Sequence, residues 1–342
     1  MKRLRLLSGI AMPLLILILS GCQKENKLPA NNATLQNNGT IAAILQDPNT
    51  SFTVTNTASI TNGRASAGKQ VKFTYLAVAL ARTGLTSTLA NLDNSYTVFA
   101  PTDDAFMAAG FKTIQDVVKA PVEVLKPILL YHALAAKVLS TQVPAGPNAA
   151  VTTINGADIY VTSNSKGVFV NGTPVIVADV KAANGVIHVI DRVLMPPVGN
   201  IVQTAVANPN FSFLVAAVLR ASQGSTNVAA LLSGDGPFTV FAPTNDAFKK
   251  MGFMSEADFL NANPDDLTPI LGYHVISGRV FSSDLSEGLR PDMFSGGKTT
   301  ITLAGGAKIK GNGNLNPANI IQTDIVSTNG VIHVIDEVLK PQ

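Results

Sequence analysis

The chain carries one long pattern twice, and this duplication constrains its fold more than any other feature. Three blocks return in the same order, offset by 142, 142 and 145 residues. Solenoid repeats are only about 20–50 residues long, so a period of this length indicates the duplication of a whole domain. The paired blocks are TVFAPTDDAF at 97–106 and TVFAPTNDAF at 239–248, PILLYHALAAKVLS at 127–140 and PILGYHVISGRVFS at 269–282, and NGVIHVIDRVLMP at 184–196 and NGVIHVIDEVLKP at 329–341.

The repeat divides the 342 residues into two domains with a leader and a tether before them. The short join Pro196-Pro197 separates the copies. The first copy has about twenty extra polar residues, which predict a surface loop or β-hairpin. The expected divisions are a leader at 1–21, a tether at 22–39, a first domain at 40–197 with its insertion at about 50–72, and a second domain at 198–342.

The first 22 residues read as an export signal. Basic Lys2, Arg3 and Arg5 precede an apolar run at 10–19, which is too short to span a bilayer. The sequence Leu-Ser-Gly-Cys that ends at Cys22 resembles the lipobox of bacterial lipoproteins. That resemblance implies a diacylglycerol on the Cys22 thiol and cleavage before it. The alternative is a chance cysteine in an ordinary signal peptide.

Cys22 is the only cysteine, so it cannot form an intramolecular disulfide. The polar residues 23–39 then form a flexible tether between the lipid and the first domain. Two acyl chains hold a protein stably at a membrane, whereas one binds marginally. We therefore expect an exported protein anchored in the bacterial cell envelope, at the outer membrane, on its periplasmic or surface face.

Charge argues against a nucleic-acid partner. The chain has 25 basic and 22 acidic residues, a formal net charge of +3. Lys2, Arg3 and Arg5 account for all of this excess, so the chain after the leader is neutral. Nucleic-acid binding requires clustered positive charge, which this sequence lacks.

The block TVFAPT predicts a buried strand that breaks at proline and leads into a helix. Thr102 and Thr244 are placed to cap that helix, and Asp104 and Asp246 favour its positively polarised start. A metal or catalytic role for the two acids is the alternative. Capping explains the residue order without further partners.

The block NGVIHVID predicts a tight Asn-Gly hairpin turn followed by a central strand, apolar on both faces. On such a strand His188 and His333 are expected to be buried, neutral and hydrogen-bonded within the core. The other two histidines, His132 and His274, follow a tyrosine at the end of short helices that we expect to begin at Pro127 and Pro269.

Catalytic, metal and cofactor patterns are missing from the sequence. It contains no G-x-S-x-G and no H-E-x-x-H motif. Two histidines per domain, without cysteine, fall short of the four ligands of a structural zinc site. We expect no metal, no cofactor and no enzymatic activity, and the sequence favours a structural role for the histidines.

The outer blocks resemble the two signature regions of the fasciclin domain family, and the Tyr-His pair resembles the motif between them. The resemblance covers about residues 40–342. It implies an α+β fold class, with two tandem domains that are each a β-sheet wedge packed with several short α-helices. The family's Tyr-His region is implicated in receptor contact, which implies partner binding at Tyr131, His132, Tyr273 and His274; a structural role for these pairs is the alternative.

The resemblance implies a non-enzymatic binding or adhesion module whose partner is a protein or a polysaccharide. The alternative is an accessory binding subunit of an envelope complex, such as a polysaccharide-uptake system. Because the insertion is the largest difference between the copies, we hypothesise that it supplies partner specificity. A tolerated insertion without a role is the competing interpretation, since long surface insertions cost little free energy.

Overall fold

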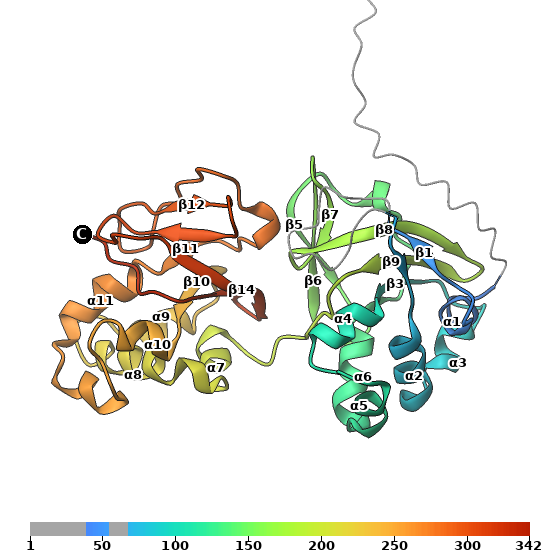
Figure 1. Cartoon of the computed structure of the whole chain (residues 1–342), viewed down its shortest axis with the longest axis horizontal. Helices are drawn as coiled ribbons and strands as arrows, with labels where there is room; N and C mark the ends of the chain where they lie inside the picture. The colour runs from blue at the N-terminus through green and yellow to red at the C-terminus, as the bar shows by residue number, and fades with distance from the viewer. Residues whose placement is uncertain (1–38, 55–67) are drawn as a thin grey trace, which may run out of the picture. The chain divides into compact units, whose positions relative to one another are not determined.

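A computed structural model describes residues 39–54 and 68–342. Within them the two copies build the same kind of domain: a curled, mixed β-sheet with short helices against one of its faces (Figure 1). Cys22, the leader and the predicted tether lie outside the described residues.

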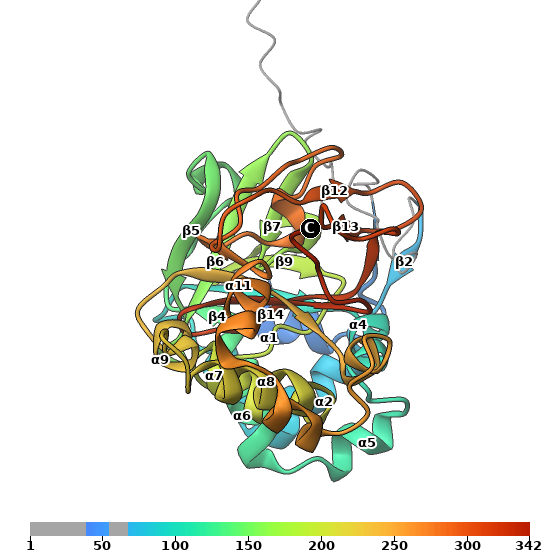
Figure 2. The ribbon, with the colours of Figure 1, turned by 90° about the vertical axis from the view of Figure 1, so that its left-hand side faces the viewer.

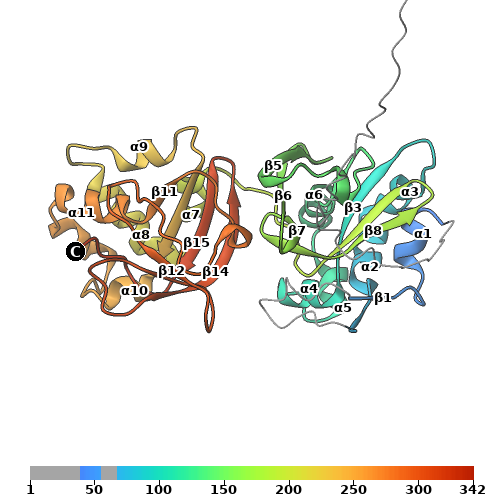
Figure 3. The same ribbon diagram turned by 90° about the horizontal axis from the view of Figure 1, so that it is seen from above.

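The first domain contains helices α1 to α6 and a seven-stranded sheet of order β4-β3-β9-β8-β7-β6-β5. Strand β8 lies beside β7, which pairs in turn with β6 (Figure 3). The bounds are α1 Ile41–Gln46, β1 Phe52–Thr53, β2 Gln70–Val71, α2 Thr74–Thr83, α3 Leu85–Ala90, β3 Tyr96–Pro101, α4 Asp103–Ala108, α5 Ile114–Lys119, α6 Val122–Tyr131, β4 Ala133–Leu134, β5 Gly146–Thr152, β6 Asp158–Asn164, β7 Gly167–Val170, β8 Thr173–Ala182 and β9 Gly185–Ile190.

The second domain repeats this order with a six-stranded sheet, β11-β10-β15-β14-β13-β12. Figure 2 shows several of its helices below its strands. The bounds are α7 Ile201–Val206, α8 Ser212–Ala221, α9 Val228–Leu232, β10 Phe238–Pro243, α10 Asn245–Lys249, α11 Pro264–Gly272, β11 Val275–Ser277, β12 Thr300–Thr302, β13 Lys308–Lys310, β14 Ala318–Ser327 and β15 Gly330–Ile335.

The sheet of each domain separates two apolar cores, because alternate residues of a strand face opposite sides. Val98 of β3 and Ile187 of β9 belong to the core on the helix side. Phe99 and Ile190, on the same two strands, belong to a second core inside the curl of the sheet. Strands β3 and β9 are parallel, and every residue of both is buried.

The helix that follows each TVFAPT strand begins at the predicted cap. The backbone N–H of Ala105 donates to Thr102 Oγ1 at 3.2 Å, and that of Ala247 donates to Thr244 Oγ1 at 3.2 Å. Asp104 forms an ion pair with Lys69, and Asp246 forms one with Lys249 at 2.8 Å. These acids therefore lie in the first turns of their helices and form ion pairs with nearby lysines.

The prediction that Pro127 and Pro269 begin their helices is wrong. Helix α6 starts at Val122 and helix α11 at Pro264, so each proline is the sixth residue of its helix. A proline there removes one backbone hydrogen bond, and burial of the apolar face offsets this loss. Leu125 and Leu129 of α6 are buried in the helix-side core.

The predicted hairpin turn is present, with Ala183 and Asn184 between the paired residues Ala182 and Gly185, but the Asn-Gly pair does more than form this turn. Gly185 has a positive φ of 153°, but a Cβ there would lie 1.9 Å from the carbonyl oxygen of Tyr96. Asn184 has no positive φ, and its amide instead binds three backbone groups: Ile41 N–H at 2.8 Å, and the carbonyls of Leu89 and Asn91, both at 2.9 Å. Gly185 is required because strand β3 approaches its backbone closely. Asn184 holds helices α1 and α3 to the sheet.

The insertion in the first domain is a hairpin whose stem packs into the core. Strands β1 and β2 pair antiparallel, with Phe52 opposite Val71. Phe52, Val54 and Val71 are buried, and the ring of Phe52 lies 5.7 Å from that of Phe73. Residues 55–67, the rest of the predicted insertion, lie outside the described residues. The stem is thus more than the polar surface feature that its composition suggested.

Candidate binding site

The two Tyr-His pairs lie inside their domains. Tyr131 and Tyr273 are 0% exposed, and His132 and His274 are 2% exposed. The four side chains therefore offer almost no surface for a partner to contact. This placement supports the structural role that the sequence left open beside receptor contact.

His132 joins the end of α6 to the last segment of the first domain. The backbone N–H of Leu194 donates to Nε2 at 2.9 Å, so the proton of the neutral ring is on Nδ1. Nδ1 then donates to the carbonyl of Ile128 at 2.8 Å. Burial lowers the pKa of His132 to about 4, which keeps the ring neutral at pH 7.

His274 repeats this geometry in the second domain. It accepts from the N–H of Leu339 at 2.8 Å and donates to the carbonyl of Ile270 at 2.8 Å. Burial lowers its pKa to about 4 as well. A neutral imidazole with both nitrogens bonded to backbone groups is a structural cross-link.

The tyrosine hydroxyls tie the helix ends to the outer strands. Tyr131 donates to the carbonyl of Asp158 at 2.8 Å and accepts from Asn171 Nδ2 at 3.0 Å. Burial raises the pKa of Tyr131 to about 12. Tyr273 donates to the carbonyl of Lys298 at 2.6 Å.

A second group brings His188 together with two residues that the sequence analysis missed, Asp179 and Ser140. Ser140 Oγ donates to the carboxylate of Asp179, and the Ser140 N–H donates to Oδ1 at 2.8 Å. The Asp179 N–H donates to His188 Nδ1 at 3.2 Å, and His188 Nε2 donates to the carbonyl of Val138 at 2.9 Å. Burial lowers the pKa of His188.

The second domain repeats this cluster with Ser282, Asp324 and His333. Ser282 Oγ donates to Asp324 Oδ2 at 2.5 Å, and the Asp324 N–H donates to His333 Nδ1 at 3.3 Å. His333 Nε2 lies 2.8 Å from the carbonyl of Val280. Asp179 and Asp324 both have positive φ, at irregular points in strands β8 and β14. Asp179 and Asp324 each lie five positions before the asparagine of an Asn-Gly block, and this shared position is the sequence signal that could have revealed them.

These clusters contain the residue types of a nucleophilic triad, but their hydrogen bonds are wrong for one. A triad needs a serine hydroxyl that donates to a histidine nitrogen. Here Ser140 donates to Asp179, while both ring nitrogens of His188 are bonded to backbone groups. The imidazole has no free lone pair to accept the serine proton, so the group orders the bulge in β8.

The single difference between the two TVFAPT blocks preserves one hydrogen bond. Asp103 Oδ1 accepts from the N–H of Tyr75 at 3.0 Å, and Asn245 Oδ1 accepts from the N–H of Phe213 at 3.0 Å. Both aspartate and asparagine have the side-chain oxygen that accepts this hydrogen bond.

Within residues 39–54 and 68–342, no three His, Cys, Asp or Glu side chains are grouped to hold a metal ion.

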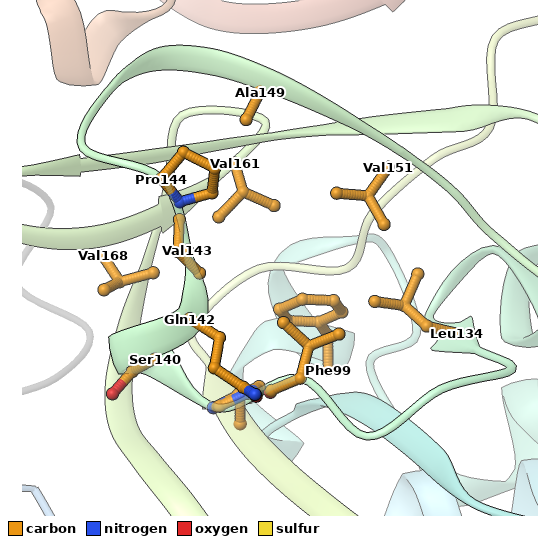
Figure 4. A pocket seen from close by; sticks show the side chains of 12 residues that line it. Phe99, Leu134, Ser140, Gln142, Val143, Pro144, Ala149, Val151, Val161 and Val168 are labelled. Atoms are coloured by element: carbon orange, nitrogen blue, oxygen red, sulfur yellow. Dashed lines mark hydrogen bonds between the residues drawn. The ribbon is translucent and has the colours of Figure 1, made fainter.

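An apolar cavity of about 120 Å³ lies beside His188 in the first domain, within the curl of its sheet. Figure 4 shows Val151 and Val161 on one side and Phe99 on the other. Ser140, Gln142 and His188 are the polar residues on its walls. Its main apolar lining residues are Phe99, Leu134, Val143, Val151, Val161 and Val168.

The second domain has a smaller apolar hollow, of about 90 Å³, among helices α7, α8 and α9. Val206 and Leu219 on its wall are 62% and 57% exposed. In the first domain the corresponding helix α1 ends in Gln46, whose Nε2 donates to Thr86 Oγ1 at 2.8 Å. The two copies therefore differ in surface chemistry at this edge of the helical layer.

Comparison with known proteins identifies the duplicated domain. The model of the fasciclin domain matches residues 71–196 and 209–341. The chain belongs to the fasciclin family. Each match contains a complete curled sheet with helices that pack on it, so the chain has two tandem fasciclin domains of mixed α+β type.

Relatives of this chain occur in animals and bacteria. Pig transforming growth factor-beta-induced protein ig-h3 is 30% identical over 252 residues, which cover 72% of this chain and 35% of ig-h3. The Synechocystis protein sll1483 is 41% identical over 146 residues, covering 41% of this chain and 73% of that protein. Immunogenic protein MPB70 of Mycobacterium bovis is 34% identical over 134 residues, covering 39% and 65%.

The match to ig-h3 thus spans about a third of that protein's length. Among solved structures, a fasciclin domain pair from the insect cell adhesion molecule Fasciclin I is similar, with a TM-score of 0.37 and 22% identity. That likeness covers 78% of this chain and 95% of the insect chain. No helix among the described residues has the length and apolar character needed to cross a membrane.

Proposed function

We propose that the chain is a non-enzymatic binding or adhesion module of the bacterial cell envelope, anchored through a lipid on Cys22. Fasciclin domains are typically adhesion or binding modules, and this chain has two of them. The sequence of the leader and Cys22 directly after it support export and anchoring.

The hydrogen bonding of the histidines is the observation that carries this proposal. All four histidines of the chain are buried, and each ring nitrogen is bonded within the domain. General acid–base catalysis needs a ring nitrogen that is free to exchange a proton with the substrate, and both nitrogens of each ring are already bonded to backbone groups. What the domains offer a partner is shape and surface.

Cells that carry the full chain provide the test. We expect them to adhere to immobilised envelope protein fractions and to incorporate a clickable fatty acid into the chain. Cys22→Ser should remove the fatty-acid label and the adhesion, because the module no longer stays on the cell. His132→Gln, if folded, should retain both properties.

Two results would contradict the proposal. If cells without the chain adhered equally well, the chain would not be the binding module. If the fatty-acid label survived in Cys22→Ser, Cys22 would not carry the lipid. If His132→Gln lost adhesion while its melting temperature stayed unchanged, His132 would have a functional role as well as a structural one. An accessory subunit of an envelope complex is the alternative, and co-purification with a defined complex in place of adhesion would favour it.

A further inference from the structure

The cavity in the first domain has the size and lining of a site for one small apolar group. It encloses about 120 Å³ and is lined almost wholly by aliphatic side chains and the ring of Phe99. An engineered apolar cavity of about 150 Å³ in another protein stays dry and binds benzene. A group of leucine to phenylalanine side-chain size therefore suits this cavity.

Most polar side-chain atoms on the wall are already bonded inside the domain. His188 uses both ring nitrogens, and Ser140 Oγ is held by Asp179. Gln142 Oε1 accepts from the N–H of Leu139 at 2.7 Å. A sugar in this cavity would bury hydroxyls without partners, which costs about 1–3 kcal/mol for each group.

Size excludes two other ligand classes. Sites for drug-sized molecules enclose about 300–1,000 Å³, several times this volume. A long acyl chain exceeds the cavity for the same reason. The cavity lies at the surface, since Gln142 and Pro144 on its wall are exposed, so a side chain that projects from a partner can enter it.

The second domain fills the corresponding space with larger side chains. The repeat aligns Val143 with Leu285, and the strand registers align Val151 with Ile301, because Val151 pairs with Ile159 as Ile301 pairs with Ile309. Leu285 and Ile301 are buried with Met293 in one cluster, whereas Val143 is only half-buried. The same scaffold therefore has a closed core in one copy and an apolar opening in the other.

We propose that this cavity binds one uncharged apolar side chain of a partner polypeptide. The proposal rests on the binding function inferred above and assigns a protein as the partner. An apolar anchor in a pocket, surrounded by polar contacts, is the usual centre of a protein interface.

The test is methyl NMR with benzene on the chain from residue 23 onward, which keeps every described residue. Benzene should shift the methyl signals of Val143, Val151 and Val161 saturably. N-acetyl-phenylalanine methylamide should compete with it. Palmitate and N-acetylglucosamine are the controls for acyl-chain and sugar ligands, and should not compete.

Two variants that fill the cavity sharpen the test. Val143→Phe places a ring in the opening, and Val143→Leu combined with Val151→Ile introduces the residues of the second domain. We expect both variants to weaken benzene binding at least tenfold without a lower melting temperature. Val124→Leu, which adds a methylene at an exposed position of α6, should bind like the wild type.

The possible outcomes distinguish a failure of the cavity as a side-chain binding site from a failure of the proposed binding function of the chain. Absent benzene shifts, or binding unchanged by both filling variants, would overturn the site. Competition by palmitate or N-acetylglucosamine alone would overturn the side-chain assignment. If cells with Val143→Phe adhere as the wild type does, the cavity is not the partner site, while the binding function stands.

Discussion

The backbone N–H of Leu194 donates to Nε2 of His132 across 2.9 Å, and the two residues are 62 positions apart in the sequence. This hydrogen bond holds the last segment of the first domain to the end of α6. Leu339 and His274 repeat it at 2.8 Å in the second domain. In the Tyr-His motif, the buried histidine ring therefore joins two chain segments by hydrogen bonds. This structural role explains why both domains have the motif, and it requires no binding partner.

Stability should fall on acidification between about pH 6.5 and pH 4. Burial lowers the pKa of His132 and His274 to about 4, against 6.5 in the unfolded chain. In that window the unfolded state binds more protons, so the free energy of unfolding decreases as pH falls, by roughly 3 kcal/mol for each histidine. Urea melts at pH 7 and pH 4.5 measure this loss.

Two variants separate the contribution of the His132 imidazole to the pH dependence of stability from the contributions of other titrating groups. His132→Gln can still offer an amide donor and a carbonyl acceptor, and should be more stable than His132→Ala, which orphans the Leu194 N–H and the Ile128 carbonyl at about 1–3 kcal/mol. Both variants should lose the His132 part of the pH dependence. An unchanged slope of stability with pH in His132→Gln would contradict the assignment.

Gly185 and Gly156 provide a matched pair for the role of the Asn-Gly motif. Both have positive φ, but a Cβ on Gly185 would lie 1.9 Å from a backbone oxygen, whereas a Cβ on Gly156 would meet open space. Gly156→Ala should therefore cost about 1 kcal/mol of backbone strain. Gly185→Ala should cost several times more, because β3 and β9 must separate. Equal losses in thermal melts would show that conformation alone requires glycine at Gly185.

The stem of the insertion should contribute to stability. Phe52 is buried against Phe73, so Phe52→Ala should destabilise the first domain by about 3 kcal/mol. Thr53→Ala, at the exposed neighbour, should cost little. Denaturant melts of the two variants check this, and equal midpoints would mean that the hairpin does not support the core.

Much of the fold could be predicted because the repeated blocks carry local signals. The strand before Pro101, the cap at Thr102 and the buried strand with His188 all follow from short-range patterns, and all three are present. The helix that contains Pro127 was misplaced because burial overrides the loss of one hydrogen bond. The role of Asn184 depends on groups up to 143 residues away, which no local pattern shows.

The candidate site was harder to predict for the same reason. Ser140, Asp179 and His188 are spread over 49 positions and meet only through the curl of the sheet. The cavity depends on small differences in side-chain volume, such as Val143 in place of leucine, and on how β5 covers the sheet. A sequence shows composition, whereas a cavity is a property of packing.

The imidazole tautomers test most directly the central claim that the duplicated histidines hold the fold together. Long-range ¹⁵N–¹H NMR distinguishes a protonated ring nitrogen from one that accepts. We predict a single neutral tautomer for each ring at pH 7, with the proton on Nδ1 in His132 and His274 and on Nε2 in His188 and His333. His132 and His274 should keep theirs at pH 5. A ring that exchanges between tautomers at pH 7, or titration of His132 or His274 near pH 6.5, would contradict the claim.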